Sequence, residues 1–406
     1  MSTTHNPRRI SFFGHFGSLN SGNESTLITM LAHLRLRFPE AEFLCVCTNP
    51  QVVAKRDGIE ATAITAGAGR DRKGGSRVLR RLRSAGTELG QLARAFRAMR
   101  GTDVLIVPGT GLVTDAFGIH GWGPLSLFRW ALAAKLRRAR LVFVSIGAGP
   151  FYSPAGRVLV RASLALADYR SYRDQASRDS LRQIGLPAER DPVYPDLVFS
   201  LPEALLPGAD PCEQRPRRVV GLGLISDQGR YSTEEPRQDA HAAYLGSLAV
   251  FVAWLLDHGY DIRLLFGDGE GDPKVLDDFK LLLAQRLGSY DEARIVGQAS
   301  ASSDVFAALA QTDVVVATRF HNVLLSMLLI KPVIAISFHH KCSSLMRQMN
   351  LAEYIHDIHE IDADRLIEQF QILERNAEAV GRTIAAGVSD ARAALDEQYG
   401  RLFAAL

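Results

Sequence analysis

A chain of 406 residues exceeds what one hydrophobic core usually supports, so we expect two domains. The hydrophobic content of 47% is ordinary for an α/β protein, and a net charge of +3 gives no argument for nucleic-acid binding. No apolar run approaches the roughly 18 residues that a transmembrane helix needs. Residues Met1–Arg9 are polar and basic and lead directly into a strand, unlike a signal peptide. We therefore expect a cytoplasmic protein.

The four cysteines show no spacing typical of metal ligands, which favours a reducing compartment and no metal site; they are Cys45, Cys47, Cys212 and Cys342. Cys45 and Cys47 share one face of a predicted strand, where their side chains have too little reach to bridge.

Basic residues concentrate in one short stretch with little acid among them: Arg70, Arg72, Lys73, Arg77, Arg80, Arg81 and Arg83. Such a cluster suits an anionic membrane surface, for instance the inner face of the cell membrane, or a charged acceptor. A solvated helix face or loop has the same composition, and this alternative stays open.

The first half of the chain alternates short apolar strands with helices, which is typical of a doubly wound sheet. We expect strands at Arg9–Phe13, Glu42–Thr48, Val104–Val107 and Leu141–Ile146, and helices at Ser25–Arg37, Thr87–Met99 and Gln175–Ile184. Residues 52–86 are weakly patterned.

Glycine turns with polar side chains follow the first and third of these strands: Asn20, Gly22, Asn23 and Glu24 after one, and Gly109, Gly111 and Asp115 after the other. Glycines let the backbone approach a ligand closely. Asparagine and glutamate side chains hydrogen-bond hydroxyls, which favours a sugar-like partner over a dinucleotide. Asn20 and Asn23 are equally consistent with turn and helix-cap residues.

A segment rich in proline, glycine and charge, Leu201–Pro216, reads as a linker to a second domain of the same kind. There we expect strands at Arg218–Leu224, Asp261–Phe266, Ala293–Val296, Val314–Ala317 and Val333–Ser337, and helices at Ala240–His258, Ser303–Ala310 and Asn322–Leu329. We predict two Rossmann-like domains, 1–205 and 216–362, facing a cleft, with a helical tail, 363–406, packed across both.

The strand Val314–Ala317 is followed at once by Arg319 and His321. Continuous β-branched runs are typical of parallel strands buried on both faces. Ligands of open α/β sheets bind at the carboxyl ends of such strands, where the next helix presents free N–H groups. An arginine fork and an imidazole at this point suit phosphate or carboxylate. Alternatively, Arg319 pairs with a neighbouring carboxylate and His321 is a satisfied interior histidine.

Several segments, in order along the chain, together resemble the polysaccharide pyruvyl transferase family. They are the turn Asn20–Asn23, the turn Gly109–Gly111 with Asp115, Ser145–Pro150, Arg173–Asp174 with Ser177, Asp191–Phe199, Arg319–His321 followed by Lys331–Val333, and Lys341 after the last strand. The resemblance implies a GT-B-like fold, similar to that of two-domain inverting glycosyltransferases. It also implies transfer of pyruvate from phosphoenolpyruvate to sugar hydroxyls as a ketal.

The resemblance also implies site residues, without a cofactor or a metal. Phosphoenolpyruvate would be bound by Arg319, Phe320, His321, Asn322, Lys341 and Arg230, and the acceptor by Asn20, Gly22, Asn23, Gly109 and Gly111. Arg319 and His321 would be catalytic, and Glu24 and Asp115 are candidates for the base. The implied acceptor is a lipid-linked oligosaccharide, a precursor of exopolysaccharide.

The sequence departs from the family pattern in three places. Glu24 and Ser25 stand where many relatives have Gly-Asp, and Thr110 interrupts a usual triple glycine. An arginine after the first strand of the second domain has no clean counterpart, although Arg230 could substitute for it. Two alternatives follow: a nucleotide-sugar-dependent glycosyltransferase of the same fold, and a carbohydrate-binding relative that has lost catalysis. The glycosyltransferase would be expected to carry an acidic residue for the ribose, and none is persuasive after Arg319.

Overall fold

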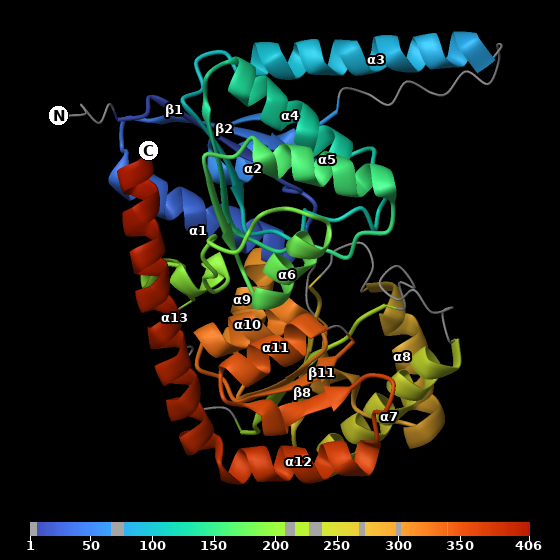
Figure 1. Ribbon diagram of the computed structural model, residues 1–406. Helices are drawn as coiled ribbons and strands as arrows, with labels where there is room; N and C mark the ends of the chain where they lie inside the picture. The colour runs from blue at the N-terminus through green and yellow to red at the C-terminus, as the bar shows by residue number, and fades with distance from the viewer. Residues whose placement is uncertain are drawn as a thin grey trace. The chain divides into compact units, whose positions relative to one another are not determined.

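The computed structural model describes residues 6–65, 77–207, 216–226, 238–267, 273–297, 302–338 and 340–406 (Figure 1). These residues form two compact units. The first unit contains Asn23–Ser200 with the described residues before Leu19 and the last residues Ala394–Leu406. The second contains Leu201–Ala393 and the short segment Leu19–Gly22.

The first unit is built on a parallel six-stranded sheet in the order β3-β2-β1-β4-β5-β6. The strands are β1 (Arg9–Phe13), β2 (Glu42–Cys47), β3 (Glu60–Ala63), β4 (Val104–Pro108), β5 (Arg140–Ile146) and β6 (Tyr169–Tyr172). The helices are α1 (Ser21–Arg37), α2 (Pro50–Asp57), α3 (Arg77–Ala98), α4 (Pro124–Leu136), α5 (Pro154–Ala165) and α6 (Gln175–Gln183).

The second unit has a parallel six-stranded sheet in the order β12-β11-β10-β7-β8-β9. Its strands are β7 (Val219–Gly223), β8 (Asp261–Leu265), β9 (Ile295–Val296), β10 (Val314–Ala317), β11 (Val333–Ser337) and β12 (Ile355–Asp357). Its helices are α7 (Gln238–Asp257), α8 (Pro273–Leu287), α9 (Ser302–Ala310), α10 (Phe320–Leu328), α11 (His340–Gln348) and α12 (Ala363–Arg375). The predicted tail is helical: α12 is followed by α13 (Ala377–Ala405), drawn in red in Figure 1.

The predicted α/β class with two doubly wound sheets is confirmed, and the buried apolar strands lie where their sequence places them. All four residues of β10 are buried, with the predicted bounds Val314–Ala317. The helix after it begins at Phe320 rather than at Asn322. The segment described as weakly patterned contains α2 and β3, and α3 begins at Arg77 rather than at Thr87.

The two sheets have the same topology. In each, the first three strands along the chain run from the centre of the sheet to one edge. The next three start beside the first strand and run to the opposite edge. The central pair is β1 with β4 in the first unit and β7 with β10 in the second. We call the carboxyl ends of these pairs the first and second switch points. Open α/β sheets bind their ligands at such points, because the helices that follow the two strands leave in opposite directions.

Three cysteines belong to the described ranges, and Cys45, Cys47 and Cys342 are buried free thiols. Burial raises the pKa of the Cys45 thiol. Among the helices that the structure describes, none is both long and apolar enough to cross a membrane. Arg70, Arg72 and Lys73 lie outside the described residues, and Arg77, Arg80, Arg81 and Arg83 belong to the first turns of α3. Their contact with an anionic membrane stays a prediction.

Candidate functional site

The second switch point is formed where β10 turns into α10. Thr318 follows the strand, and its N–H donates to the carbonyl of Gly223 at the end of β7 (3.3 Å). Arg319 is the N-cap residue of α10, with an extended backbone (φ −77°, ψ 131°). His321 and Asn322 therefore belong to the first turn of α10. The N-terminus of this helix lies at the carboxyl end of the central strand pair, where the helix dipole favours an anion.

The side chain of Asn322 is fully buried at this switch point. A Cβ atom added at Gly223 would lie 3.1 Å from its Nδ2, and one added at Gly267 would lie 3.3 Å from its Oδ1. The carboxamide thus lies between the ends of β7 and β8. Neither its nitrogen nor its oxygen has a hydrogen-bond partner within the described part of the chain. Burying an amide in this state costs about 1–3 kcal/mol, which makes Asn322 a candidate for hydrogen-bonding a ligand.

Two glycines make room for this arrangement. A side chain at Gly223 would press on Ala317, whose Cβ is 3.0 Å from the added atom, and one at Gly267 would lie 3.2 Å from Cγ of Arg319. Only glycine lets strand ends and side chains approach so closely. The chain therefore keeps both strand ends free of side chains beside Arg319 and Asn322.

His321 lies against the short segment Leu19–Gly22, which belongs to the same unit. A Cβ atom added at Gly22 would lie 2.0 Å from the imidazole ring of His321. The N–H of Ser21 donates to the carbonyl of Gly267 (3.1 Å). Gly22, predicted from the sequence as an acceptor-binding residue, thus meets the predicted donor-binding His321.

The other predicted donor residues are distributed along the same sheet edge. Lys341 is half-buried in the first turn of α11, which follows β11, and β11 pairs with β10. The ring of Phe320 makes an edge contact with His321, with ring centroids 5.0 Å apart. Arg230 lies outside the described residues. The roles assigned to these residues stay predictions.

Glu24, one candidate for the base, is buried in the first turn of α1. Its carboxylate accepts a hydrogen bond from the N–H of Ser18 (3.0 Å) and forms an ion pair with Arg56. Burial raises the pKa of Glu24, and the positive charge of Arg56 offsets only part of that rise. A raised pKa suits a group that exchanges protons near neutral pH, but the carboxylate is already held by a cation.

Asp115, the other candidate, anchors the loop after β4 to the start of α5. Its carboxylate accepts hydrogen bonds from the N–H groups of Tyr152 and Ser153 (both 2.7 Å) and from the Ser153 hydroxyl (2.6 Å). Burial by itself raises the pKa of Asp115, but these hydrogen bonds outweigh it and hold the pKa below the usual value. Because a carboxylate of low pKa is a weak base, the geometry favours a structural role.

The remaining acceptor candidates have local partners or packing reasons. The side-chain amide of Asn23 donates to the carbonyl of His15 (3.0 Å). A Cβ atom at Gly109 would lie 2.6 Å from the carbonyl oxygen of Ser145, so glycine is needed where β4 and β5 end. Gly111 is exposed and Asn20 is half-buried. None of these observations tests acceptor binding.

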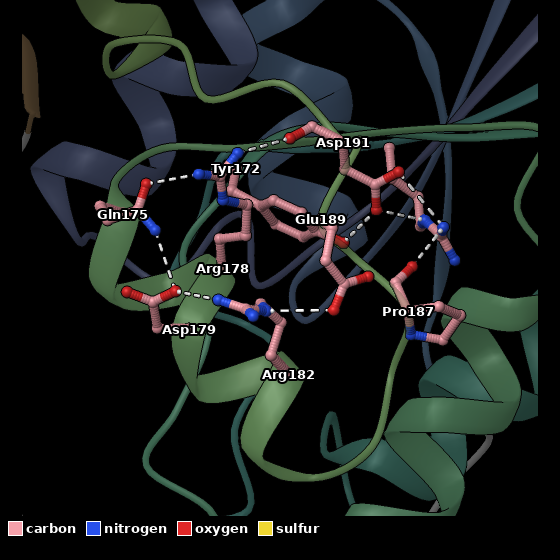
Figure 2. Close-up of polar contacts among 9 residues, drawn as sticks. Tyr172, Gln175, Arg178, Asp179, Arg182, Pro187, Glu189 and Asp191 are labelled. Atoms are coloured by element: carbon pink, nitrogen blue, oxygen red, sulfur yellow. Dashed lines mark hydrogen bonds and ion pairs between the residues drawn. The ribbon is translucent and has the colours of Figure 1, made fainter.

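The segments around β6 and α6, which also carried the resemblance, form a paired polar cluster (Figure 2). The Asp191 carboxylate accepts a hydrogen bond from the hydroxyl of Tyr172 (2.7 Å) and pairs with Arg170 (2.8 Å). Arg178 donates to the Asp191 carbonyl (3.1 Å). Burial and the nearby Asp191 raise the pKa of Tyr172, so its hydroxyl stays protonated. This cluster fixes the path of the chain after α6.

Next to it, Arg173 and Asp196 form an ion pair (3.1 Å) whose side chains are only 5% and 2% exposed. Asp174 caps α6 by accepting from the N–H of Ser177 (2.7 Å), and the Ser177 hydroxyl accepts from the N–H of Ala148 (3.0 Å). These residues hold the ends of β5 and β6 together. They support the sheet edge rather than line it.

The profile of the polysaccharide pyruvyl transferase family matches residues 20–340. The chain belongs to this family. The matched range begins at the turn before α1 and ends at the start of α11, so it includes the second switch point and β4 but not β1. One similar protein is the amylovoran biosynthesis protein AmsJ of Erwinia amylovora. The two are 21% identical over 301 residues, which cover 69% of this chain and 68% of AmsJ.

Solved structures similar to this pyruvyl transferase family member support the fold alone. HepE from Anabaena, solved in complex with UDP, is 15% identical with a TM-score of 0.60. The match covers 98% of this chain and 100% of the HepE chain. The UDP-GlcNAc 2-epimerase from Neisseria meningitidis, bound to UDP-GlcNAc, is 12% identical with a TM-score of 0.59. The match covers 97% of this chain and 99% of the epimerase. The predicted GT-B-like architecture is therefore confirmed.

Proposed function

We propose that this protein transfers pyruvate from phosphoenolpyruvate to two hydroxyls of a sugar in a polysaccharide or glycolipid precursor, forming a ketal and releasing phosphate. Membership in the family supports a transferase of polysaccharide biosynthesis. The observation that carries the proposal for the donor is the second switch point. There a buried carboxamide, Asn322, has no partner among the described residues and lies in the first turn of a helix capped by Arg319.

The charge of the donor matches the groups at this edge. Phosphoenolpyruvate carries about three negative charges on one phosphate and one carboxylate, so it needs several charged hydrogen-bond donors. Arg319 and His321 at the start of α10, Lys341 at the start of α11, and the N–H groups of α10 supply them. The nitrogen of Asn322 would donate to the same ligand.

In the proposed reaction a proton is added to C3 of phosphoenolpyruvate, which makes C2 electrophilic, and a sugar hydroxyl forms a bond to C2. The bond from C2 to the phosphate oxygen then breaks, and a second hydroxyl oxygen takes its place and closes the ketal. The proton count balances, because one hydroxyl proton replaces the proton delivered to C3 and the other leaves with the phosphate.

The residues divide this work by their chemistry. Arg319 and Lys341 stabilise the charge that develops on the leaving phosphate, as preorganised donors do in other transferases. His321 binds the phosphate and moves a proton, because an imidazole titrates near working pH. Of the two candidates for the base of the sugar hydroxyls, Glu24 is the one with the raised pKa.

A thermal-shift titration tests the donor directly. We expect phosphoenolpyruvate to raise the melting temperature of the wild-type protein and to leave that of His321→Ala unchanged. Ligand at 100 times its dissociation constant adds about 2.7 kcal/mol to the folded state, which moves a melting curve by several degrees. A panel of nucleotide sugars serves as the comparison. A shift with a nucleotide sugar and none with phosphoenolpyruvate would overturn the proposal in favour of a glycosyltransferase.

A further inference from the structure

Three aromatic rings gather at the first switch point, and neither the sequence motifs nor the donor chemistry accounts for them. His15 follows β1, while Phe117 and Trp122 lie in the segment between β4 and α4. The rings of His15 and Trp122 are stacked, with centroids 4.7 Å apart and an interplanar angle of 26°. The ring of Phe117 lies 5.0 Å from Trp122 at 46°. We call these three residues the aromatic platform.

The platform packs partly on the core of the first unit and is partly exposed to solvent. Trp122 packs against the hydrophobic core of the unit, which gives it a fixed base. His15 is oriented by a hydrogen bond between its Nδ1 and the hydroxyl of Thr48 (2.6 Å), at the end of β2. Phe117 keeps 38% of its surface exposed, and His15 and Trp122 are half-buried. Aromatic rings that remain partly exposed at the carboxyl ends of the central strands are available to contact a ligand.

A polar group accompanies the rings at this edge. Thr110, in the glycine turn directly after β4, is 3% exposed, and its hydroxyl has no hydrogen-bond partner in the ranges that the structure describes. A buried hydroxyl in this state costs free energy unless a ligand completes it.

We propose that the aromatic platform stacks against the apolar face of a hexopyranose ring of the acceptor, and that the hydroxyl of Thr110 hydrogen-bonds a hydroxyl of that sugar. A pyranose has one face made largely of C–H groups and a rim of hydroxyls, and it therefore matches aromatic rings flanked by a hydroxyl. This inference rests on the proposed function for its biological setting, since that function supplies the sugar acceptor. Stacking of the sugar on the aromatic platform does not require phosphoenolpyruvate to be bound.

Fluorine NMR of the protein labelled with 5-fluorotryptophan provides the test. The chain contains three tryptophans, and Trp→Phe substitutions assign one signal to each of Trp122, Trp130 and Trp254. Trp130 is fully buried in the first unit and Trp254 lies in the second, so both serve as internal controls. The probes are the methyl β-pyranosides of glucose, galactose and mannose, with glycerol as a polyol that has no ring face. Each titration is run with and without phosphoenolpyruvate.

We expect at least one pyranoside to shift the Trp122 signal in a saturable manner while glycerol and the two control signals show no change. Phe117→Ala should weaken this binding about 3-fold to 10-fold, as loss of one aromatic contact does. Leu136→Ala, which removes another exposed apolar side chain of the same unit (58% exposed), should leave it unchanged. A stationary Trp122 signal with every pyranoside, or an equal shift with glycerol, would overturn the inference.

The same experiments separate this inference from the proposed function. If the Trp122 signal responds to a pyranoside but phosphoenolpyruvate produces no thermal shift, the platform stands and the donor assignment fails. If phosphoenolpyruvate stabilises the protein through His321 while Trp122 is silent in its presence, the donor assignment stands and the platform is wrong.

Discussion

The first and second switch points have the same strand order and different chemistry. At the second, a short turn leads directly into α10 and places Arg319, His321 and Asn322 at the strand end. At the first, a long segment after β4 carries Phe117 and Trp122. The buried polar group without a partner in the described ranges is the hydroxyl of Thr110 there, and the amide of Asn322 at the second switch point. The two edges share a topology that favours ligand binding, and their connecting segments give them the different chemistry from which we propose an anion site and a sugar site.

The acidic residues sharpen the contrast. In the first unit Glu24 is paired with Arg56, and Asp115 and Asp196 are satisfied by hydrogen bonds and an ion pair. These carboxylates stabilise the edge of the sheet. At the second switch point the fully buried polar group, Asn322, has no partner among the residues described. The carboxylates of the first edge are therefore paired, whereas the second edge carries a buried amide with no partner in the described ranges.

Removing the buried ion pair of the first unit should have the largest effect on stability. Asp196→Ala removes the nearer carboxylate from the buried guanidinium of Arg173 and leaves the longer contact with Asp174 (3.6 Å). We expect a loss of up to about 3–5 kcal/mol in the unfolding free energy. Urea unfolding followed by hydrogen exchange of first-unit peptides measures it. Glu189→Ala, which removes an exposed partner of Arg182, is the control and should cost less than about 1 kcal/mol. Equal losses in the two variants would contradict the structural role of the pair.

Arg319→Ala should lower kcat/KM for phosphoenolpyruvate about 100-fold to 1000-fold, because it removes a charged donor that stabilises the leaving phosphate. Arg319→Lys should recover only part of this loss, since an ammonium group cannot form two parallel hydrogen bonds to phosphate. Phosphate release at varied phosphoenolpyruvate concentration is the measurement. Arg286→Ala, an exposed arginine in the last turn of α8, should retain full activity. Full activity in Arg319→Ala would remove Arg319 from the site.

Asn322→Leu separates binding from stability at the same residue. Because the buried amide has no partner in the described residues, an apolar side chain of similar size should raise the melting temperature or leave it unchanged. We expect the affinity for phosphoenolpyruvate to fall at least about tenfold, the loss of one hydrogen bond to a charged group. Calorimetric titration and thermal unfolding of one sample provide both values. Ser326→Ala, one turn later on α10, is the control for affinity. A large destabilisation with unchanged affinity would make Asn322 a structural residue.

Because of Asp115, the unfolding free energy of the first unit should fall at low pH. Its pKa is lower in the folded protein than in the unfolded chain, so the stabilisation is complete above the ordinary value of 3.8 and is lost as the pH falls through the folded pKa. Asp115→Asn should cost roughly 1–3 kcal/mol at pH 7 and flatten the acid limb of the stability curve. Hydrogen exchange of peptides containing Tyr152 and Ser153 from pH 3 to 7 checks this. An acid limb unchanged in Asp115→Asn would show that other groups cause it.

The second switch point was predictable because its elements have strong local signals. The run Val314–Ala317 is wholly β-branched or small, and it is wholly buried. The start of α10 was misplaced because the polar residues His321 and Asn322 precede the apolar run that marks the rest of the helix. β3 escaped prediction because it is a short edge strand, and none of its four residues is buried.

The first switch point was less predictable for a different reason. The polar residues of the motifs were identified, but their partners are far away in the sequence: Asp115 meets the N-cap of α5, and Glu24 meets Arg56 on α2. The aromatic platform brings His15 against Trp122, which lies far away in the sequence, so no local sequence pattern predicts this contact. Motif residues identify an edge of the sheet, whereas tertiary contacts decide what each of them does.

Hydrogen exchange with each ligand compares the two switch points most directly. We predict that phosphoenolpyruvate slows exchange in peptides covering 318–324, at the start of α10, and leaves peptides covering 109–123 unchanged. A methyl pyranoside that shifts the Trp122 signal should do the reverse. Protection by phosphoenolpyruvate at 109–123 with none at 318–324 would contradict the account, because the donor would then bind at the edge that we assign to the sugar.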